Sequence, residues 1–239
     1  MNIVLIGYGR MGHEIEEAAV KRGHTIVLAI DADNLEDLNE ENMKEADVAI
    51  EFTMPEAAFG NISACLKMGV PVVSGTTGWL KDYDRARELC IENGTSFLHS
   101  SNFSIGVSLL YRLSSELAEY MKHYSEYSVS IEEIHHVKKL DAPSGTAIAL
   151  AEGIAGRHPG YAAGWCPDQE RKEGMIPVKS VREGLVPGTH IITWDSDIDT
   201  ISLKHEAKNR KGLALGAVVA AEFISTRKGV FTMKDVLGF

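Results

Sequence analysis

The first 31 residues combine two strand-like runs, a glycine turn and a helix, and their order constrains the fold more than any other feature. An apolar run over residues 1–6 leads into Gly7-Tyr8-Gly9-Arg10-Met11-Gly12. Apolar residues then recur at helical spacing, and a second apolar run, Thr25–Ile30, ends in Asp31. This order of strand, glycine turn, helix, strand and acid is typical of a unit that binds a dinucleotide. We therefore predict that the turn and the helix N-terminus hold a pyrophosphate and that Asp31 accepts hydrogen bonds from the adenosine ribose.

Strand-like and helical segments continue to alternate over the next 70 residues or so. The predicted strands are Asp47–Phe52, Val70–Ser74 and Ser96–His99, and the predicted helices are Pro55–Met68 and Leu80–Asn93. Such alternation indicates a parallel sheet covered on both faces, with ligands at the carboxyl ends of its strands. Two further turns, Gly75-Thr76-Thr77-Gly78 and Ser100-Ser101-Asn102-Phe103, follow strands and so belong to that edge. By themselves they could equally be ordinary turns.

The second half of the chain has a different pattern. A helix over about 107–124 precedes an alternating strand over 127–136, and a helix is predicted over about 145–156. Strands at Val178–Arg182, Thr189–Trp194 and Thr200–His205 then follow one another without helices, and residues 157–177 are predicted to be a mobile loop. An apolar helix from Gly212 to about Thr226 should pack back on the first domain.

The expected fold class is α/β, with an N-terminal Rossmann-like parallel sheet and a second α+β domain built on an open mixed sheet. We expect a dinucleotide-binding domain at residues 1–104, completed by 208–239, and a substrate-binding and oligomerisation domain at 105–207.

Charge and cysteine content narrow the function classes. Twenty-four basic and thirty-four acidic residues give a net charge of −10, which argues against nucleic acid or an anionic membrane as a partner. Cys65, Cys90 and Cys166 lack metal-ligand spacing and are expected to be reduced thiols. No signal peptide is recognisable and no apolar run reaches the roughly 20 residues of a membrane span. We expect a soluble cytoplasmic protein.

Proton-transfer groups are concentrated between Glu133 and Ala147. His135 and His136 offer proton transfer near neutral pH, as histidines do, and Lys138 and Lys139 add positive charge. The following turn opens a run of high helix propensity, whose first backbone amides would face an anion. These features predict a pocket for a small molecule with carboxylate groups.

The segment also has three other interpretations: a metal site, a hydrolase site and a structural pair of histidines. Adjacent histidines on a strand point to opposite faces and no third ligand has suitable spacing, so we expect no metal. A serine hydrolase would use Ser144, but the strand-to-helix elbow of such enzymes is missing. The histidines could also be a buried structural pair and the lysines solvated surface groups.

The motifs occur in an order that resembles one known family. They are the glycine turn, Gly75-Thr76-Thr77-Gly78, Ser101-Asn102-Phe103-Ser104 with Gly106, and Glu133-x-His-His-x-x-Lys139-x-Asp-Ala-Pro-Ser-Gly-Thr-Ala147. Together they closely resemble the dihydrodipicolinate reductase family, also called 4-hydroxy-tetrahydrodipicolinate reductases. The resemblance continues to the segment 231–237 and covers nearly the whole chain, and the histidine-rich segment is its most specific part.

The resemblance implies a role for individual residues. His135 would be the general acid/base, Lys139 the proton donor, and His136, Gly145 and Thr146 the ligands of substrate carboxylates. The residues implied in cofactor binding are Gly7, Tyr8, Gly9, Arg10, Met11, Gly12, Asp31, Gly75, Thr76, Thr77, Ser100, Ser101, Asn102 and Phe103. Family members reduce 4-hydroxy-tetrahydrodipicolinate to tetrahydrodipicolinate in the diaminopimelate pathway of lysine biosynthesis and are cytoplasmic homotetramers that associate through the second domain's sheets.

The sequence departs from the family pattern near the ribose site. Ala32 and Met54 stand where many members carry an arginine, and the Asp31 carboxylate would repel a 2′-phosphate. We therefore expect NADH to be preferred, with NADPH as the weaker cofactor. Two alternatives stay open: another Rossmann-fold reductase or amino-acid dehydrogenase that acts on an imino acid, and a non-catalytic dinucleotide-binding regulatory protein.

Overall fold

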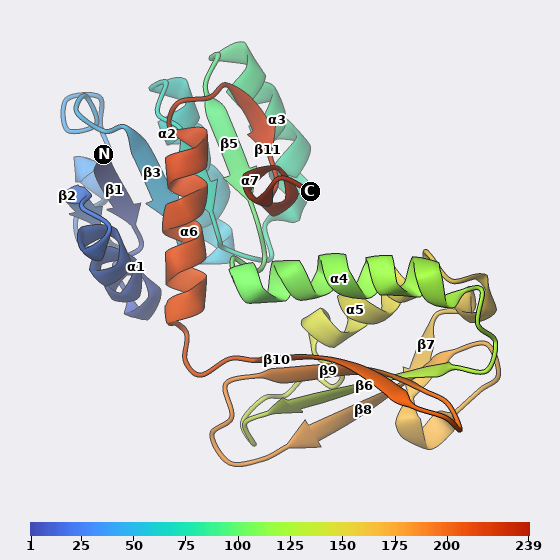
Figure 1. Ribbon diagram of the computed structural model, residues 1–239. Helices are drawn as coiled ribbons and strands as arrows, with labels where there is room; N and C mark the ends of the chain where they lie inside the picture. Colours follow the sequence, from blue (N-terminus) through green and yellow to red (C-terminus); the bar gives the residue numbers. More distant parts are fainter. The chain divides into compact units, whose positions relative to one another are not determined.

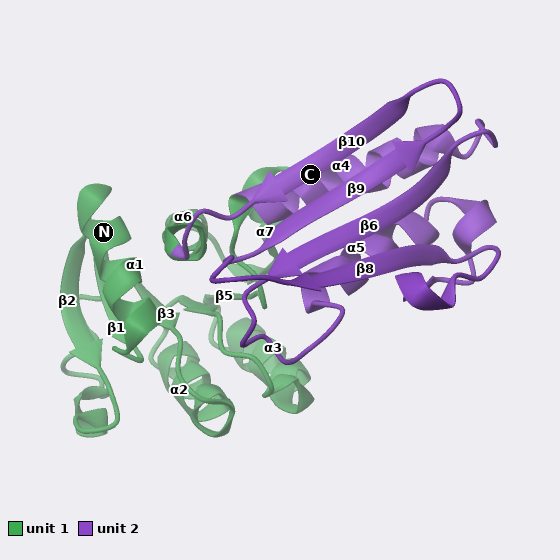
Figure 2. Cartoon of the chain, turned by 90° about the horizontal axis from the view of Figure 1, so that it is seen from below, with its two compact units in different colours: residues 1–105, 211–239 green, residues 106–210 purple.

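The chain folds into two compact units (Figures 1 and 2). The computed structural model describes all residues from 1 to 239. Unit 1 contains residues 1–105 and 211–239, and unit 2 contains residues 106–210. The sequence predicts domains at 1–104 with 208–239 and at 105–207.

Unit 1 is built on a six-stranded parallel sheet with the strand order β11-β5-β4-β3-β1-β2. Its strands are β1 (Asn2–Ile6), β2 (Thr25–Ile30), β3 (Val48–Glu51), β4 (Val72–Ser74), β5 (Ser96–His99) and β11 (Gly229–Phe231). Its helices are α1 (Arg10–Lys21), α2 (Pro55–Lys67), α3 (Tyr83–Glu92), α6 (Lys211–Ile224) and α7 (Met233–Leu237), with short 3₁₀ turns at Leu35–Asp37 and Leu80–Asp82. The predicted Rossmann-like parallel sheet is confirmed.

Both faces of this sheet are covered, because successive residues of a strand point to opposite sides and both sets are apolar. In β1, Ile3 and Leu5 lie in one core with residues of α1 and α6. Val4 and Ile6 lie in a second core with residues of α2 and α3. Helices on opposite sides of the sheet are visible in Figure 1. Helix α6, which follows unit 2 in the chain, therefore packs on the first unit, as its apolar spacing predicted.

The last strand and helix of unit 1 were not predicted. Strand β11 pairs with β5 and forms an edge of the sheet. It spans only three residues, too few for a periodic pattern to be recognised. The short helix α7 begins with a capping box in which Thr232 and Asp235 satisfy each other's backbone N–H groups.

Unit 2 is built on a five-stranded mixed sheet with the order β10-β9-β6-β8-β7. Its strands are β6 (Ser128–His135), β7 (Trp165–Pro167), β8 (Ile176–Arg182), β9 (Thr189–Asp195) and β10 (Thr200–Glu206), and its helices are α4 (Ile105–Met121) and α5 (Gly145–Ala155). Strand β6 pairs with β8 in parallel and with β9 antiparallel, and β9 and β10 form the predicted hairpin. The predicted mixed sheet is confirmed.

One face of the unit 2 sheet is covered, and the buried residues of β6 lie on it. Val129, Ile131, Glu133 and His135 are all buried, whereas the residues between them are partly exposed. The first two pack with apolar residues of α4 and α5 in one core, and Figure 2 shows both helices behind the sheet. The alternation of buried and partly exposed residues therefore continues to Glu133 and His135. These two ionisable residues lie on the covered face, beyond the apolar core.

The prediction of a mobile loop over residues 157–177 is wrong. The segment contains two 3₁₀ turns, Pro159–Tyr161 and Asp168–Glu170, separated by strand β7. This strand pairs in parallel with β8 at the sheet edge, and Cys166 in its centre is 3% exposed. Glycine and proline break long elements, but they leave room for a three-residue edge strand whose pairing partner lies further along the chain.

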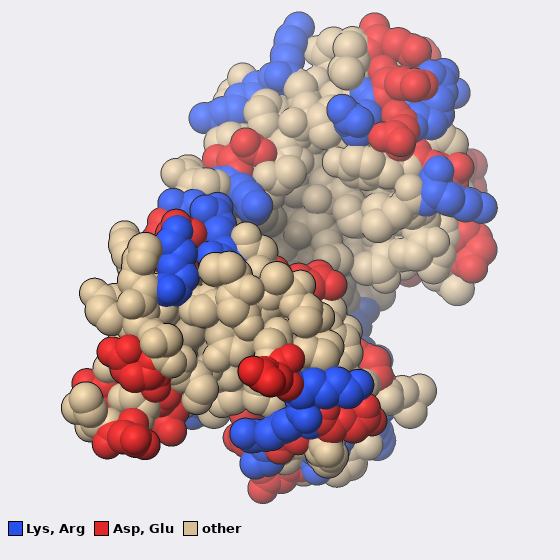
Figure 3. Space-filling model, turned by 90° about the vertical axis from the view of Figure 1, so that its right-hand side faces the viewer, with Lys and Arg blue, Asp and Glu red and all other residues tan.

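Acidic and basic side chains are interspersed on the surface. On the face drawn in Figure 3, lysine and arginine alternate with aspartate and glutamate, and no basic patch extends across that face. Helix α3 shows the pattern in detail, because Arg85 pairs with Glu88 (2.9 Å) and Arg87 with Asp84 (3.2 Å). None of the helices is both long enough and apolar enough to cross a membrane.

Candidate active site

The predicted cofactor segments lie together on one edge of the unit 1 sheet. They follow β1, β2, β4 and β5, and the carboxyl ends of parallel strands meet at the same edge. Ligands of open α/β sheets bind at this edge. The structure therefore brings together in unit 1 the four segments that the sequence singled out.

The glycine turn after β1 has a backbone that only glycine adopts without strain. Gly7 has φ +94°, and a Cβ atom there would lie 2.0 Å from the carbonyl oxygen of Phe52. Its N–H donates to the Ile30 carbonyl of β2 (2.8 Å). Gly9 caps α1, whose first intrahelical bond runs from the His13 N–H to the Gly9 carbonyl (3.1 Å). The earlier amides, those of Arg10, Met11 and Gly12, have no intrahelical partner and suit a phosphate.

Asp31 follows β2 with its carboxylate at the surface. Its Oδ1 accepts the Ala32 N–H (2.9 Å), and its own N–H donates to Asn34 Oδ1 (2.7 Å). Asp31 and Ala32 are both exposed. The turn therefore leaves the Asp31 carboxylate exposed at the carboxyl end of β2.

The turns after β4 and β5 differ in which of their residues are exposed to solvent. After β4, Thr76 is 5% exposed, whereas Thr77 is exposed. After β5, the Ser100 hydroxyl donates to the Asn102 carbonyl (2.8 Å) and Asn102 Oδ1 accepts the Ser104 N–H (2.8 Å). Phe103 is 1% exposed and its ring belongs to the core, so it could contact a dinucleotide only through its backbone.

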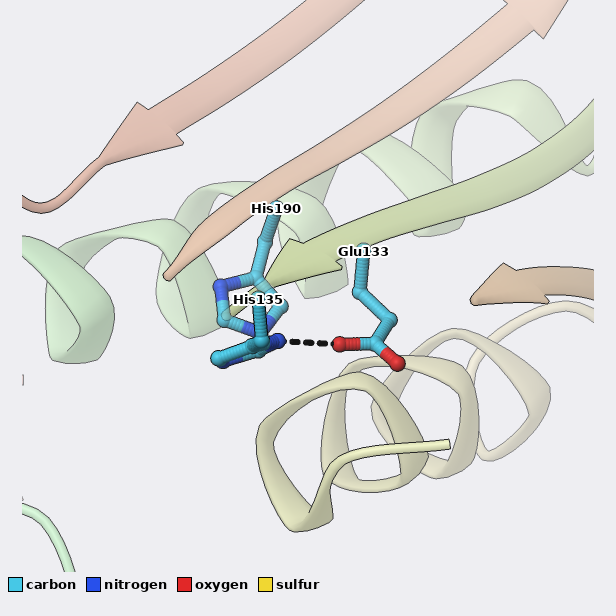
Figure 4. A group of neighbouring side chains, drawn as sticks. All are labelled: Glu133, His135 and His190. Atoms are coloured by element: carbon cyan, nitrogen blue, oxygen red, sulfur yellow. Dashed lines mark hydrogen bonds and ion pairs between the residues drawn. The ribbon is translucent and has the colours of Figure 1, made fainter. Parts of the chain in front are cut away.

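In unit 2, His135 is the last residue of β6 and forms a hydrogen-bonded pair with Glu133 (Figure 4). The two residues are two positions apart on one strand, so their side chains share a face. Glu133 is 0% and His135 8% exposed. The contact joins His135 Nδ1 to Glu133 Oε2. A carboxylate on Nδ1 fixes the ring orientation and leaves Nε2 for proton transfer to a ligand.

Arg182 holds the other oxygen of Glu133. It lies on β8 opposite His135, and its Nη2 is 2.8 Å from Glu133 Oε1 and 2.6 Å from the Asp141 carbonyl. Burial acts to raise the pKa of Glu133, but the bond from Arg182 and the neighbouring His135 outweigh it and leave this pKa below its ordinary value. Glu133 is therefore an anion at neutral pH.

Burial lowers the pKa of His135 from its ordinary value. Glu133 opposes this shift, and the charges of Lys139 and Arg182 add to it. A free His135 is thus mainly neutral near pH 7, and an anionic ligand would favour its protonation.

His190 completes this cluster from β9. It lies opposite Glu133 in the strand pairing, and its ring centroid is 5.2 Å from that of His135. Ser144 Oγ accepts the Ala147 N–H (3.2 Å) and also forms a hydrogen bond with His190 Nε2 (3.2 Å). The other ring nitrogen of His190, Nδ1, is buried without a hydrogen-bond partner. Burial and the neighbouring His135 lower the pKa of His190 to about 4.

Sequence spacing offered no third metal ligand beside His135 and His136, but strand pairing places His190 next to His135. Donor atoms of Glu133, His135 and His190 all lie within 4.8 Å of one another. Ligands of a tetrahedral zinc ion, however, stand roughly 3.4 Å apart at bond lengths of about 2.1 Å. The direct hydrogen bond between His135 and Glu133 is shorter than this, and the Arg182 cation lies on the same carboxylate. We interpret the cluster as a hydrogen-bonded proton-transfer group.

The remaining predicted residues lie between the end of β6 and the first turn of α5. Lys139 Nζ pairs with Asp141 Oδ1 (2.8 Å), a contact that the sequence did not predict. His136 is partly exposed, and its N–H donates to the Val186 carbonyl (2.8 Å). Ser144 caps α5 through the Ala147 N–H, so the amides of Gly145 and Thr146 remain at an exposed helix start. The helix start thus provides donors for a carboxylate.

Four residues near His135 were missed as site residues: Glu133, Arg182, Gly188 and His190. Glu133 could have been found from the sequence, because it lies two positions before His135 on a strand and so shares its face. Arg182 and His190 are placed by strand register, which no local pattern shows. A Cβ atom at Gly188 would lie 2.9 Å from His135 Nε2, so this glycine leaves room beside that nitrogen.

The two units of the chain match two parts of one known protein family. Residues 1–103 match the family described as dihydrodipicolinate reductase, N-terminus, and residues 106–237 match dihydrodipicolinate reductase, C-terminus. A 4-hydroxy-tetrahydrodipicolinate reductase of Christiangramia forsetii is 53% identical, over 99% of this chain and 98% of the relative. That of Alkaliphilus metalliredigens is 34% identical, over 96% of this chain and 95% of the relative.

A solved structure agrees with these matches. The dipicolinate-bound dihydrodipicolinate reductase of Paenisporosarcina sp. TG-14 superposes with a TM-score of 0.80 at 26% identity, covering 97% of each chain. A probable dehydrogenase from Thermotoga maritima, at 12% identity and a TM-score of 0.60, covering 99% of this chain and 92% of its own, shares the fold alone. On its sequence and its fold, the chain belongs to the dihydrodipicolinate reductase family.

Proposed function

We propose that this oxidoreductase uses a reduced nicotinamide dinucleotide to convert 4-hydroxy-tetrahydrodipicolinate to tetrahydrodipicolinate, a step of lysine biosynthesis through diaminopimelate. The relatives at 53% and 34% identity carry the name of this activity. The observation that supports it most directly is the buried Glu133–His135 pair, which shares one segment with Lys139 and the start of α5.

The reaction takes up one hydride and one proton and releases one water. The bound dinucleotide supplies the hydride. The residues of unit 2 hold the ring and supply the proton. Carboxylates of the substrate are bound by His136 and by the amides of Gly145 and Thr146, and this fixed orientation removes a large part of the barrier.

The hydride brings two electrons to the substrate ring, and a proton must neutralise the negative charge that develops there. His135 is oriented by Glu133, and a bound dianion would favour its imidazolium form. Lys139 carries a second proton on Nζ. When the anionic substrate binds, this ammonium group exchanges its contact with Asp141 for a contact with the substrate. In this assignment Lys139 donates to the ring and His135 acts as the general acid/base.

The experiment that tests the activity uses substrate made in the assay by a synthase from pyruvate and aspartate semialdehyde, with loss of NADH absorbance as the signal. Rapid oxidation only in the presence of the synthase supports the proposal. Oxidation with imino acids formed from 2-oxo acids and ammonia, but not with the synthase product, would identify an amino-acid dehydrogenase. No oxidation with any of these substrates, despite NADH binding, would identify a regulatory protein.

We further propose that NADH is the preferred cofactor. The exposed Asp31 carboxylate has Ala32 and not a cation next to it, and a 2′-phosphate would meet this negative charge. The test is the ratio of kcat/KM for NADH and NADPH. A preference for NADPH of more than about tenfold would contradict the assignment.

The resemblance also supports a cytoplasmic homotetramer with unit 2 as the substrate-binding and oligomerisation domain. One face of the unit 2 sheet carries no helix of that unit, which leaves a surface for sheet-to-sheet association (Figure 2). Light scattering of the purified chain measures the mass directly, and a monomer at micromolar concentration would contradict the tetramer.

A further inference from the structure

Glu51, the last residue of β3, is a buried carboxylate that the proposed mechanism does not use. It is 0% exposed. Its Oε2 accepts the Ser74 hydroxyl (2.6 Å), and its Oε1 accepts the Thr76 hydroxyl (2.7 Å) together with the N–H and the hydroxyl of Thr53. All these donors are hydroxyl groups or a backbone amide, and none of them is a cation. The negative charge of Glu51 is therefore hydrogen-bonded but not neutralised.

The nearest imidazole on the same edge does not supply the missing positive charge. His99 Nε2 lies 3.1 Å from the Thr76 carbonyl oxygen and not against the carboxylate. Burial lowers the pKa of His99, so this ring is neutral at pH 7. A buried charge without a counter-ion is costly, and a positive charge bound nearby would offset this cost.

The strand order indicates which part of a bound dinucleotide would lie near Glu51. Asp31 marks the adenosine ribose after β2, and the glycine turn marks the pyrophosphate after β1. Because the order continues with β3 and β4, the second half of a dinucleotide that crosses β1 would lie over these two strands. Glu51 ends β3, and the hydroxyl groups of Thr53 and Thr76 bind its carboxylate from the turns after β3 and β4.

We propose that the uncompensated charge of Glu51 stabilises the oxidised nicotinamide ring over the reduced one, and so favours departure of the hydride. This rests on the proposed function, because it requires a nicotinamide dinucleotide. The reduced ring is neutral and the oxidised ring carries one positive charge. Transfer of the hydride, with its two electrons, to the substrate creates that positive charge in the field of Glu51, which itself gains and loses nothing. Glu51 is thus an electrostatic residue that acts without touching the reacting atoms.

The test compares binding of NAD⁺ and NADH to the full-length protein by calorimetry. Glu51→Gln keeps the shape and removes the charge, and hydroxyl groups can rotate to accept from its amide. We expect the ratio of the Kd for NAD⁺ to that for NADH to rise about tenfold, the size of a unit-charge interaction over roughly 10 Å at an effective dielectric constant near 20. Glu51→Asp, which keeps the charge, should leave the ratio near that of the wild type even if both affinities fall.

Glu51→Ala repeats the test in case the glutamine variant does not fold, with circular dichroism as the check of folding. Equal weakening of both forms in the neutral variants would assign Glu51 to loop positioning and overturn the proposal. So would unfolding of both neutral variants, which would assign the charge to folding. If the wild type bound neither form, the proposed function itself would fail. Wild-type turnover with an unchanged ratio in Glu51→Gln would overturn only this inference.

Discussion

Replacing Glu133 with glutamine tests the assignment of His135 most directly. Arg182 requires an oxygen at its 2.8 Å contact, so the amide oxygen must face Arg182 and the NH₂ group must face His135 Nδ1. The neutral ring then accepts at Nδ1 and carries its proton on Nε2. Without the carboxylate, the imidazolium form of His135 also loses its main stabilising partner, so its pKa falls further.

The size of the effect follows from these contacts. Loss of an oriented general acid costs on the order of 10²-fold or more in kcat. Arg182 keeps its bonds to the Asp141 and Val181 carbonyls, so we expect a modest loss of stability, about 2 kcal/mol, from weakening one charged hydrogen bond. The activity that needs protonated His135 is lost as the pH rises through its pKa, so the alkaline limb of the pH–rate profile should move to lower pH.

Steady-state kinetics over a pH series, with urea unfolding in parallel, measures both effects. Glu132→Gln is a matched control on the same strand, because Glu132 points to the opposite face and pairs with Lys179 at 2.6 Å. If Glu133→Gln had the kcat and the pH profile of this control, the pair would be structural and the role assigned to His135 would be refuted.

Four further outcomes follow from the same cluster. His135→Ala should lower kcat on the order of 10²-fold or more, whereas His136→Ala should act mainly on KM, and steady-state kinetics separates the two. Gly188→Ala should lower kcat/KM, because its Cβ would lie 2.9 Å from His135 Nε2 at a strained φ of +156°; wild-type kinetics would contradict this. Ser144→Ala removes the cap of α5 and should cost about 1 kcal/mol in urea unfolding. His190 has its pKa lowered from 6.5 to about 4, so the unfolded chain binds more protons between these values; stability should fall as the pH drops from 6.5 to about 4, with a shallower fall in His190→Gln.

Local sequence patterns predicted most of unit 1 because each of its signals lies within a few neighbouring residues. The predicted strands Thr25–Ile30 and Ser96–His99 coincide with β2 and β5, and the proline that starts Pro55–Met68 is the first residue of α2. Strand β7 was missed because a three-residue strand has no period of its own and is formed by pairing with β8. Its glycine- and proline-rich surroundings predicted a loop instead.

The sequence by itself determined the dinucleotide-binding unit, the two sheet types and the segment that carries His135 and Lys139, because periodicity, turn residues and motif spacing are local properties. Only the tertiary structure decided the surroundings of these groups. Strand register places His190 and Arg182 around Glu133, and strand order places the uncompensated charge of Glu51 beneath the turns after β3 and β4. The physical reason is that register and order are set by packing between residues far apart in the chain, and burial, which controls the protonation of His135 and His190, exists only once that packing has formed.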